Sequence, residues 1–241
     1  MVIFILLRRT GIRKLFLFFI VIFLLLLFLS RVGKGIIPTV AEPVYHGGTD
    51  EKVIALTCNV FWGEEYIGPM LEILTDKDVL MTFFIGGTWA ENFPELVKKM
   101  QSLGHEIGSH GYSHPHPDRI SREANRRDIT RAQDILENIT GKKPALFAPP
   151  YGERGAVVLQ TAEELGYQTI LWSIDTIDWQ RPGPQVIKDR VSGKAHNGGI
   201  VLMHPTAPTV KALPGIIDDL RGQGYKLITV GEMLQAAPDN N

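Results

Sequence analysis

The sequence predicts an α/β protein in which helices cover a parallel sheet, either open or closed into a barrel. From residue 52 to residue 236, short apolar runs of strand length alternate with amphipathic stretches of helix length. Because strands joined through helices run in the same direction, repeated β-then-α units favour a parallel sheet. In such folds the functional residues gather where the strands end and the loops begin. The ends of the predicted strands are therefore the places to look for chemistry.

The individual elements follow from the same alternation. The apolar runs predict strands at residues 53–57, 80–84, 106–109, 145–147, 169–172, 200–203 and 226–230. The amphipathic stretches predict helices at residues 65–74, 94–103, 121–139, 155–165, 185–191 and 213–223. Ser121 has the residue type of an N-cap. Glycines stand where a left-handed residue would end a helix, at Gly104, Gly141, Gly166 and Gly224.

Residues 1–34 are predicted to be a signal anchor or a signal peptide. Leu15 to Leu29 is an unbroken apolar run of 15 residues that follows a basic stretch. As a helix it would span roughly 22 Å, which lies between the length of a signal-peptide core and that of a full membrane span. Four basic residues precede the run and two follow it, which places the N-terminus in the cytoplasm.

A clear cleavage site is missing, since residues 39–41 (Thr-Val-Ala) form only a weak one. We therefore expect a single-pass anchor in the cell membrane with the domain outside the cytoplasm, and a protein secreted after signal cleavage is the alternative. Residues 35–51 are rich in Gly and Pro and predict a linker. Residues 52–237 are then one domain.

Charge and cysteine content exclude several classes of function. Six of the 25 basic residues lie in residues 1–41, which contain no acid, so the rest of the chain has 19 basic and 26 acidic residues. A domain with this net negative charge is a poor partner for nucleic acid, because nucleic-acid binding depends on Lys and Arg contacts to phosphate. The single cysteine, Cys58, excludes an internal disulfide and a cysteine-based zinc cage.

Histidines are concentrated in one predicted strand-end loop. Four of the seven lie in the segment GHEIGSHGYSHPHP, at His105, His110, His114 and His116. The spacing of the first two around Glu106 is one residue too long for a zincin motif. His110 and His114, flanked by Gly111 and Pro115, can instead converge on one metal from a bent loop. Two loop histidines alone are more often structural, so the interpretation depends on what the other strand ends carry.

Other strand ends carry matching chemistry. Asp175 and Asp178 follow one predicted strand in WSIDTIDW, and His204 follows another in IVLMHP. The loop FAPPYG, which contains Tyr151, follows a third strand, and Asn59 follows the first. Three histidines, an aspartate and an aromatic-proline loop at successive strand ends would line one pocket.

These motifs together resemble the polysaccharide deacetylases of the NodB-homology type, carbohydrate esterase family 4. GHEIGSHGYSHP is similar to the metal motif of that family, FAPPYG to its groove-wall motif, and DTIDW and IVLMHP to its last two motifs. The resemblance spans about residues 52–236 and is specific, because four motifs occur in the family's order. The sequence pattern T-x-N-V-x-W-G at residues 57–63 is most similar to membrane-anchored members of the family of the sporulation type.

The resemblance implies a distorted (β/α) barrel that removes acetyl groups from N-acetylated sugars of peptidoglycan or chitin-like polymers. It also implies a divalent metal, usually zinc, with cobalt, nickel or manganese as alternatives. It assigns each candidate residue a role. His110 and His114 hold the metal, His204 is the general acid, Asp175 holds the His204 imidazole, the Tyr151 amide stabilises the oxyanion, and Trp179 and Leu202 line the acetyl pocket. Packing roles stay open for Trp179 and Leu202, and a capping or surface role is favoured for Asp178.

The sequence also departs from the family pattern. Asn59 stands at the position of the catalytic base, Val60 at that of a metal ligand, and Ala148 at that of the arginine that pairs with the base. An amide cannot accept the proton, although its oxygen can ligate a metal. Glu64 and Glu65 could supply a third ligand, but they are better explained as opening the following helix.

Two hypotheses from different classes remain. The first is a metal-dependent hydrolase of an N-acetylated cell-wall glycan with an impaired or altered base. The second is a catalytically inactive pseudoenzyme of the same fold that binds glycan. The sequence does not determine the oligomeric state.

Overall fold

The computed structural model describes residues 14, 16–24, 26 and 42–236. The chain divides into two compact units, Met1–Thr39 and Val40–Asn241. In the first unit the described residues are helical. Within the described parts of the chain, no helix combines the length and apolarity that crossing a bilayer requires. Most of the predicted leader 1–34, and the cleavage candidate at 39–41, lie outside the described residues.

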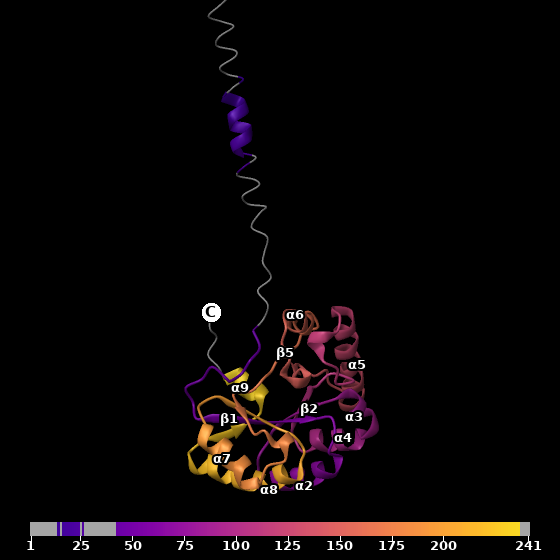
Figure 1. Ribbon diagram of the computed structural model, residues 1–241, viewed down its shortest axis with the longest axis vertical. Helices are drawn as coiled ribbons and strands as arrows, with labels where there is room; N and C mark the ends of the chain where they lie inside the picture. The colour runs from indigo at the N-terminus through magenta and orange to yellow at the C-terminus, as the bar shows by residue number, and fades with distance from the viewer. Residues whose placement is uncertain (1–13, 15, 25, 27–41, 237–241) are drawn as a thin grey trace, which may run out of the picture. The chain divides into compact units, whose positions relative to one another are not determined.

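The second unit is built on a curled sheet of eight parallel strands (Figure 1). The strands follow the order β5-β4-β3-β2-β1-β7-β6, and β8 pairs with β1. Their bounds are β1 Val53–Val60, β2 Thr82–Ile85, β3 Glu106–Ser109, β4 Leu146–Phe147, β5 Gln168–Thr169, β6 Ile174–Asp175, β7 Gly199–Met203 and β8 Lys226–Ile228. The path ends at β5 and β6, and these two strands are not paired, so the sheet is a half-barrel rather than a closed barrel. The predicted parallel α/β class is confirmed.

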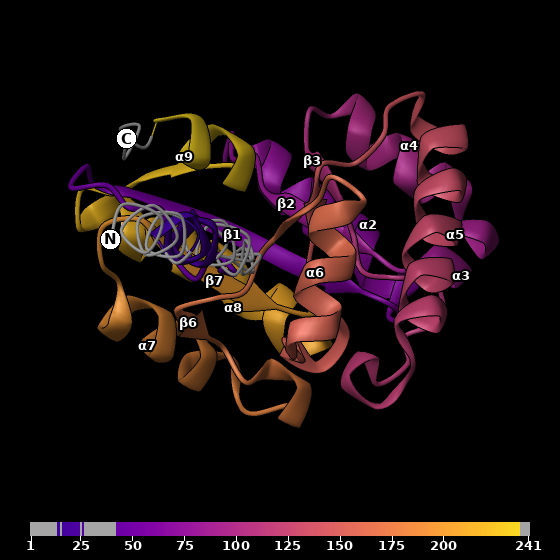
Figure 2. The same ribbon diagram turned by 90° about the horizontal axis from the view of Figure 1, so that it is seen from above.

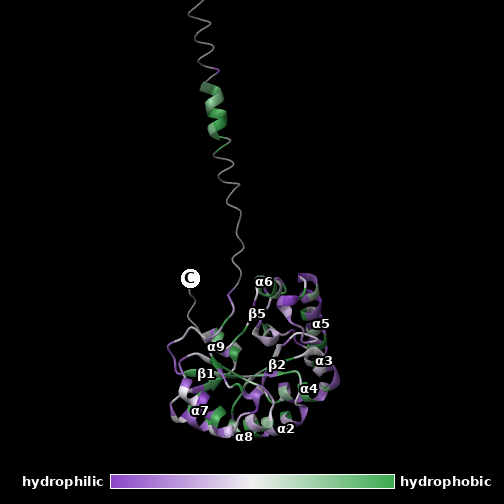
Figure 3. Ribbon diagram, in the orientation of Figure 1, coloured by the Kyte–Doolittle hydropathy of each residue, from purple (hydrophilic) through white to green (hydrophobic). Residues whose placement is uncertain are grey.

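Among the described residues, seven helices lie on the outer side of this sheet (Figure 2). They are α2 Glu64–Asp76, α3 Gly87–Asn92, α4 Pro94–Ser102, α5 Arg122–Thr140, α6 Ala156–Glu164, α7 Pro184–Lys194 and α8 Ala207–Gly222. Helix α9, Val230–Ala236, packs on the other face, where Val230 and Met233 join the cluster of Val53 and Ala55. Short 3-10 turns lie at Pro117–Arg119, Pro150–Gly152 and Asp178–Gln180. Figure 3 shows hydrophobic residues along β1 and a mixture of polar and apolar residues on the helices around it.

The central strand β1 separates two apolar clusters because its side chains alternate between the faces of the sheet. All eight of its residues are buried. Ile54, Leu56, Cys58 and Val60 pack in the cluster shared with the outer helices. Val53 and Ala55 pack in the cluster on the opposite face. By the same alternation Thr57 and Asn59 lie on the face of Val53 and Ala55, so β1 delivers Asn59 to the inside of the half-barrel and Val60 to the outside.

The termini of the helices follow the local signals in the sequence. Ser121 caps α5 through its hydroxyl oxygen, which accepts from the backbone N–H of Ala124 at 3.2 Å. The four predicted stop glycines all have positive φ, at Gly104, Gly141, Gly166 and Gly224. Helix α8 begins at Ala207, six residues before its predicted start at 213, because Thr206 caps it and accepts from Thr209 N. The prolines at 208 and 214 concealed this beginning in the sequence.

The end of the predicted linker is joined to the sheet. Val44 forms a parallel bridge to Ile170 beside β5, and His46 forms an antiparallel bridge to Gly199 of β7. The Val44 N–H donates to Thr169 O at 2.9 Å, and its carbonyl accepts from Leu171 N at 2.7 Å. We call residues 42–47 the strap. It pairs with both sides of the gap that the half-barrel leaves open.

Candidate functional site

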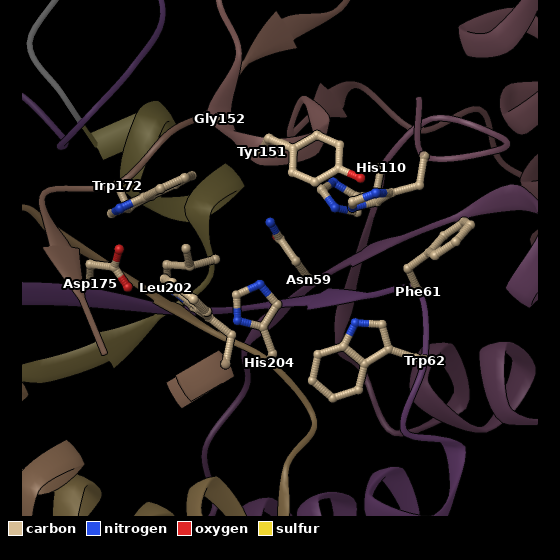
Figure 4. A pocket seen from close by; sticks show the side chains of 12 residues that line it. Asn59, Phe61, Trp62, His110, Tyr151, Gly152, Trp172, Asp175, Leu202 and His204 are labelled. Atoms are coloured by element: carbon tan, nitrogen blue, oxygen red, sulfur yellow. The ribbon is translucent and has the colours of Figure 1, made fainter. Parts of the chain in front are cut away.

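A cavity of about 490 Å³ opens where the carboxyl ends of the strands meet (Figure 4). Residues from β1, β6 and β7 and from the segments that follow β1, β3, β4, β5, β6 and β7 line it. The lining residues are Asn59, Phe61, Trp62, His110, His114, Tyr151, Gly152, Trp172, Asp175, Trp179, Leu202 and His204. All eight residues that the sequence predicted as catalytic, metal-binding or substrate-binding therefore line one cavity.

His110 and His114 lie side by side on the loop after β3, with ring centroids 4.9 Å apart. His110 Nδ1 is 2.6 Å from the carbonyl oxygen of Ala148. Since a carbonyl only accepts, Nδ1 carries the proton and Nε2 keeps its lone pair. Burial, and then the neighbouring His114, lower the pKa of His110 to about 3. Burial also lowers the pKa of His114. Both rings are thus neutral near pH 7, which is the form that ligates metals.

The conformation of this loop is held by an acid from α5. Asp128 accepts the backbone N–H of Tyr112 at 2.8 Å and that of Ser113 at 3.0 Å. It also accepts the Ser113 hydroxyl at 2.7 Å. His114 has a positive φ of 54°, which is unfavourable for a residue with a Cβ. The three hydrogen bonds offset that cost and keep His114 beside His110.

Asn59 lies at the centre of the cavity, with His204 on one side of it and His110 and Tyr151 on the other (Figure 4). The side chain is buried, and its Oδ1 has no hydrogen-bond partner among the described residues. Val60 is fully buried in the cluster on the helix side and does not line this cavity.

The donors that remain fit a divalent cation only weakly. Two neutral imidazoles and the unpaired amide oxygen of Asn59 face the same cavity. The described residues contain no group of three His, Cys, Asp or Glu side chains that could hold a metal. Imidazole suits zinc, copper, iron and nickel, whereas an uncharged set of this kind lacks the carboxylate that would strengthen binding.

Asp178 holds the His204 ring, and the prediction that Asp175 would hold it is wrong. Asp178 Oδ1 is 2.8 Å from His204 Nδ1, and Oδ2 accepts the His204 backbone N–H at 2.6 Å. The Thr209 hydroxyl donates to the same Oδ2 at 2.6 Å. Asp178 is fully buried, so the surface or capping role that the sequence favoured for it is also wrong. Figure 4 shows the other ring nitrogen of His204 on the side of Asn59.

Asp175 lines the same cavity in a different setting. Its Oδ1 accepts the backbone N–H of Ile177 at 2.8 Å, which closes a local turn. Ile177 has a positive φ of 52°, and this turn brings Asp178 under His204 while Asp175 stays at the cavity wall. A left-handed isoleucine gives no signal in a sequence, because β-branched residues rarely adopt that conformation.

Tyr151 lies on a turn whose shape exposes its ring. Its φ of 59° is positive, and the residue is 56% exposed. The ring lies 4.6 Å from His114 and stacks on His116 at 3.9 Å between centroids. The first hydrogen bonds of the turn are donated by Gly152 and Glu153, so the turn itself does not use the Tyr151 N–H. Leu202 is buried in the cavity wall, while Trp179 is half-exposed at the edge.

Three aromatic residues of the cavity were missed by sequence reasoning. Phe61 packs against His114 with centroids 4.7 Å apart. Trp62 lies nearly parallel to the His204 ring at 6.0 Å. Trp172 forms part of the far wall. Phe61 and Trp62 directly follow the observed β1, and Trp172 is the last residue of the predicted strand 169–172. The end of that predicted strand was a usable signal for Trp172, because strand ends face the cavity in parallel folds.

The comparisons with known proteins agree with this geometry. A family model described as polysaccharide deacetylase matches residues 46–170. YlxY of Bacillus subtilis (strain 168), an uncharacterized protein, is 41% identical over 193 residues, which make up 80% of this chain and 60% of that protein. A peptidoglycan-N-acetylglucosamine deacetylase of Bacillus cereus is 38% identical over 192 residues, 77% of this chain and 90% of the relative. The chain thus spans less than two thirds of the length of YlxY.

Two solved structures are equally similar to this chain in fold, and their descriptions differ in activity. BA3943 of Bacillus anthracis, described as a pseudoenzyme of carbohydrate esterase family 4, has a TM-score of 0.78 at 40% identity and covers 80% of this chain and 69% of its own. A BA3943 mutant described as having restored enzymatic activity has a TM-score of 0.78 at 38% identity, covering 80% and 71%. By its fold, its matched motifs and these relatives, the chain belongs to the polysaccharide deacetylase family, carbohydrate esterase family 4.

Proposed function

We propose that this chain is a slow, metal-assisted hydrolase that removes acetyl groups from an N-acetylated cell-wall polysaccharide. The observation that carries the proposal is the hydrogen-bonded pair of His204 and Asp178 facing the His110–His114 pair across one cavity. Deacetylation requires a polarised carbonyl, an attacking water and a proton for the leaving amine. Groups suited to two of these three tasks are present.

His204 supplies the proton. Asp178 fixes its Nδ1 and leaves the opposite nitrogen toward the cavity, where it can protonate the amine as the amide bond breaks. The Tyr151 N–H donates to the developing oxyanion. His110, His114 and the Asn59 oxygen are the residues that would hold a divalent metal, most readily zinc and otherwise cobalt, nickel or manganese, and such a metal would supply polarisation of the carbonyl and a more acidic water.

The cavity has no dedicated base to remove the proton from the attacking water. Asn59 occupies the position of the base and cannot accept a proton. A positioned base contributes about 10²–10⁴ in rate, or roughly 3–5 kcal/mol of the barrier. Turnover is therefore expected to be slower than that of a carboxylate-containing relative by about this factor.

The second candidate is a glycan-binding pseudoenzyme. It is favoured by Asn59, whose amide occupies the position of the base in a cavity with aromatic walls. The BA3943 structure, which is similar to this chain, is described as a pseudoenzyme. In this alternative the aromatic walls bind the N-acetylated sugar and no bond is broken.

For the cellular setting we propose a single-pass anchor within residues 1–34 that holds the domain outside the cytoplasmic membrane, beside the cell-wall glycan. The apolar run from Leu15 to Leu29 and its basic flanks support this. A secreted form produced by signal cleavage is the alternative. Mass spectrometry of the N-terminus of the mature protein distinguishes them.

The test is acetate release from N-acetylglucosamine oligomers and from peptidoglycan, with added zinc or cobalt. The full chain should release acetate slowly, and His110→Ala should reduce release to the level without enzyme. Asn59→Asp restores a carboxylate and should raise the rate about 10²-fold or more. Asn138→Asp, the same change at an exposed position of α5, is the matched control.

Equal release by the wild type and His110→Ala would contradict the hydrolase. Saturable binding of the oligomers without turnover, together with no metal in the purified protein, would establish the pseudoenzyme instead.

A further inference from the structure

A second, smaller cavity of about 160 Å³ adjoins the main one. Six residues line it: Tyr45, Tyr151, Gly152, Arg154, Leu171 and Trp172. Tyr151, Gly152 and Trp172 line both cavities. The two spaces are therefore neighbours that share one wall, and a ligand longer than one sugar can occupy both.

The shared wall is thin at Gly152. This residue is buried with a positive φ of 65°, and a Cβ there would lie 2.6 Å from the Trp172 ring. Any larger residue would displace Trp172, which faces both cavities. Glycine thus keeps the wall as bare backbone, with Trp172 packed against it.

Arg154 gives the second cavity a positive charge without an acidic partner. None of the ion pairs among the described residues includes Arg154. Its Nη1 donates to Gly152 O at 3.2 Å, which holds the guanidinium beside the shared wall. The neighbouring acid, Glu153, is engaged elsewhere, by His116 Nδ1 and Asp118 N. The remaining guanidinium N–H groups have the planar fork that matches a carboxylate.

The strap contributes an aromatic ring opposite this charge. Tyr45 is partly exposed, and the Arg154 guanidinium lies 5.8 Å from its ring centroid. The backbone hydrogen bonds of Val44 to Thr169 and Leu171 fix its position. A segment predicted as a tether therefore forms one side of a binding space.

We infer that this second cavity is a subsite for a carboxylate-bearing unit of the glycan whose neighbouring N-acetyl sugar lies in the main cavity. The inference rests on the proposed function and makes it more specific. It favours an acidic glycan of the muramic type over a neutral chitin-like chain. The carboxylate could belong to the sugar itself or to a peptide attached to it, and the experiment separates these two sources.

The experiment measures binding by calorimetry with the full chain and three probes. These are N,N′-diacetylchitobiose, the N-acetylglucosamine–N-acetylmuramic acid disaccharide, and the same disaccharide carrying its stem peptide. The wild type should bind an acidic disaccharide about 3- to 10-fold more tightly than chitobiose, the range expected for a partly exposed charged hydrogen bond. Preference for the peptide-free acidic disaccharide assigns the carboxylate to the sugar, and preference for the peptide-bearing one alone assigns it to the peptide.

Variants connect the preference to Arg154. Arg154→Gln should abolish the preference, and a circular-dichroism spectrum and a urea midpoint equal to those of the wild type show that the variant is folded. Arg154→Lys keeps the charge without the fork and should retain part of the preference. Arg127→Gln removes an exposed charge on α5, outside both cavities, and should behave as the wild type.

A wild type without preference, or a preference that survives Arg154→Gln, overturns the subsite. The same measurements, combined with acetate release, distinguish failure of the subsite from failure of the proposed hydrolase. Acetate release from chitobiose without any preference leaves the hydrolase and removes the subsite. An Arg154-dependent preference without acetate release in any variant leaves the subsite and removes the hydrolase.

Discussion

The two aspartates of DTIDW have the same chemistry and different surroundings. Asp178 is fully buried and accepts from the His204 backbone, the His204 ring and the Thr209 hydroxyl. Asp175 lies at the cavity wall and accepts one backbone N–H. A buried carboxylate must be fully hydrogen-bonded, so Asp178 is the acid that fixes the imidazole.

Substituting the two aspartates separately should therefore have unequal effects. Asp178→Asn places an N–H₂ among donors and should lower the free energy of unfolding by about 3 kcal/mol. Asp175→Asn keeps an acceptor oxygen and should cost less than about 1 kcal/mol. Urea unfolding followed by circular dichroism measures both. Equal losses in the two variants would contradict the assignment of Asp178 to His204.

Buried neutral histidines predict how stability depends on pH. Burial lowers the pKa of His105 to about 4, and burial followed by His114 lowers that of His110 to about 3. In the unfolded chain both titrate near 6.5. Between pH 6.5 and 4 the unfolded chain therefore binds more protons than the folded one, and stability falls as the pH falls.

The expected loss is up to about 1.4 kcal/mol per pH unit for each histidine in that range. It should be measured by urea unfolding at several pH values with chelator present, so that metal does not compete for His110. His105→Gln keeps an acceptor for the Met81 N–H and should make the slope shallower. His46→Gln, at an exposed position, serves as the control. A slope that His105→Gln leaves unchanged would count against the role of His105.

At the scale of elements, α5 acts on the site through one side chain. Asp128 links this helix to the loop of His110 and His114 by hydrogen bonds to Tyr112 and Ser113. The sequence predicted α5 and the loop separately, but a local pattern does not show which residue of a helix faces a distant loop.

Removing this link should loosen the loop without unfolding the domain. Asp128→Ala is expected to speed amide hydrogen exchange at Tyr112 and Ser113 by about 10-fold, because about 1–2 kcal/mol of local stabilisation is lost. Asp128→Asn retains one acceptor and should have a smaller effect. Asp134→Asn, at an exposed position of the same helix, should leave the exchange unchanged. Unaltered exchange in Asp128→Ala would contradict the positioning role.

The elements that the sequence did not predict are all short. Strand β6, Ile174–Asp175, has only two residues, and α3, Gly87–Asn92, begins with a glycine and lasts less than two turns. Helix α9, Val230–Ala236, starts where an apolar strand was predicted to end. Such short elements are stabilised by pairing and packing with distant residues, so they leave little periodicity in the sequence.

At the scale of the domain, the strap is part of the fold. Val44 packs against the cluster that contains Val53, Ala55 and Ile200, and the strap pairs with residues on both sides of the open gap. Its Gly and Pro content and its lack of periodicity predicted a linker. What holds the strap is backbone pairing, which does not depend on side-chain pattern.

Truncation tests this role. The free energy of unfolding of a chain that begins at Gly48 should be about 1–3 kcal/mol lower than that of a chain that begins at Glu42. The shorter chain loses the packing of Val44 and the bridges of the strap. The chain from Glu42 should match the chain from Val40. Identical urea midpoints for the Gly48 and Glu42 chains would show that the strap adds nothing to stability.

The sequence by itself determined the parallel α/β class, most helix and strand positions, the family resemblance and eight of the residues that line the cavity. The class and the element positions follow from periodicity, the resemblance follows from four short motifs, and the shared location follows from the rule that parallel strands end on one side. The tertiary structure decided that Asp178 and not Asp175 holds His204, that position 60 faces away, and that the strap brings Tyr45 beside Arg154. Each of these depends on which way a backbone turns or on what packs across the sheet, and such long-range geometry leaves no pattern in neighbouring residues.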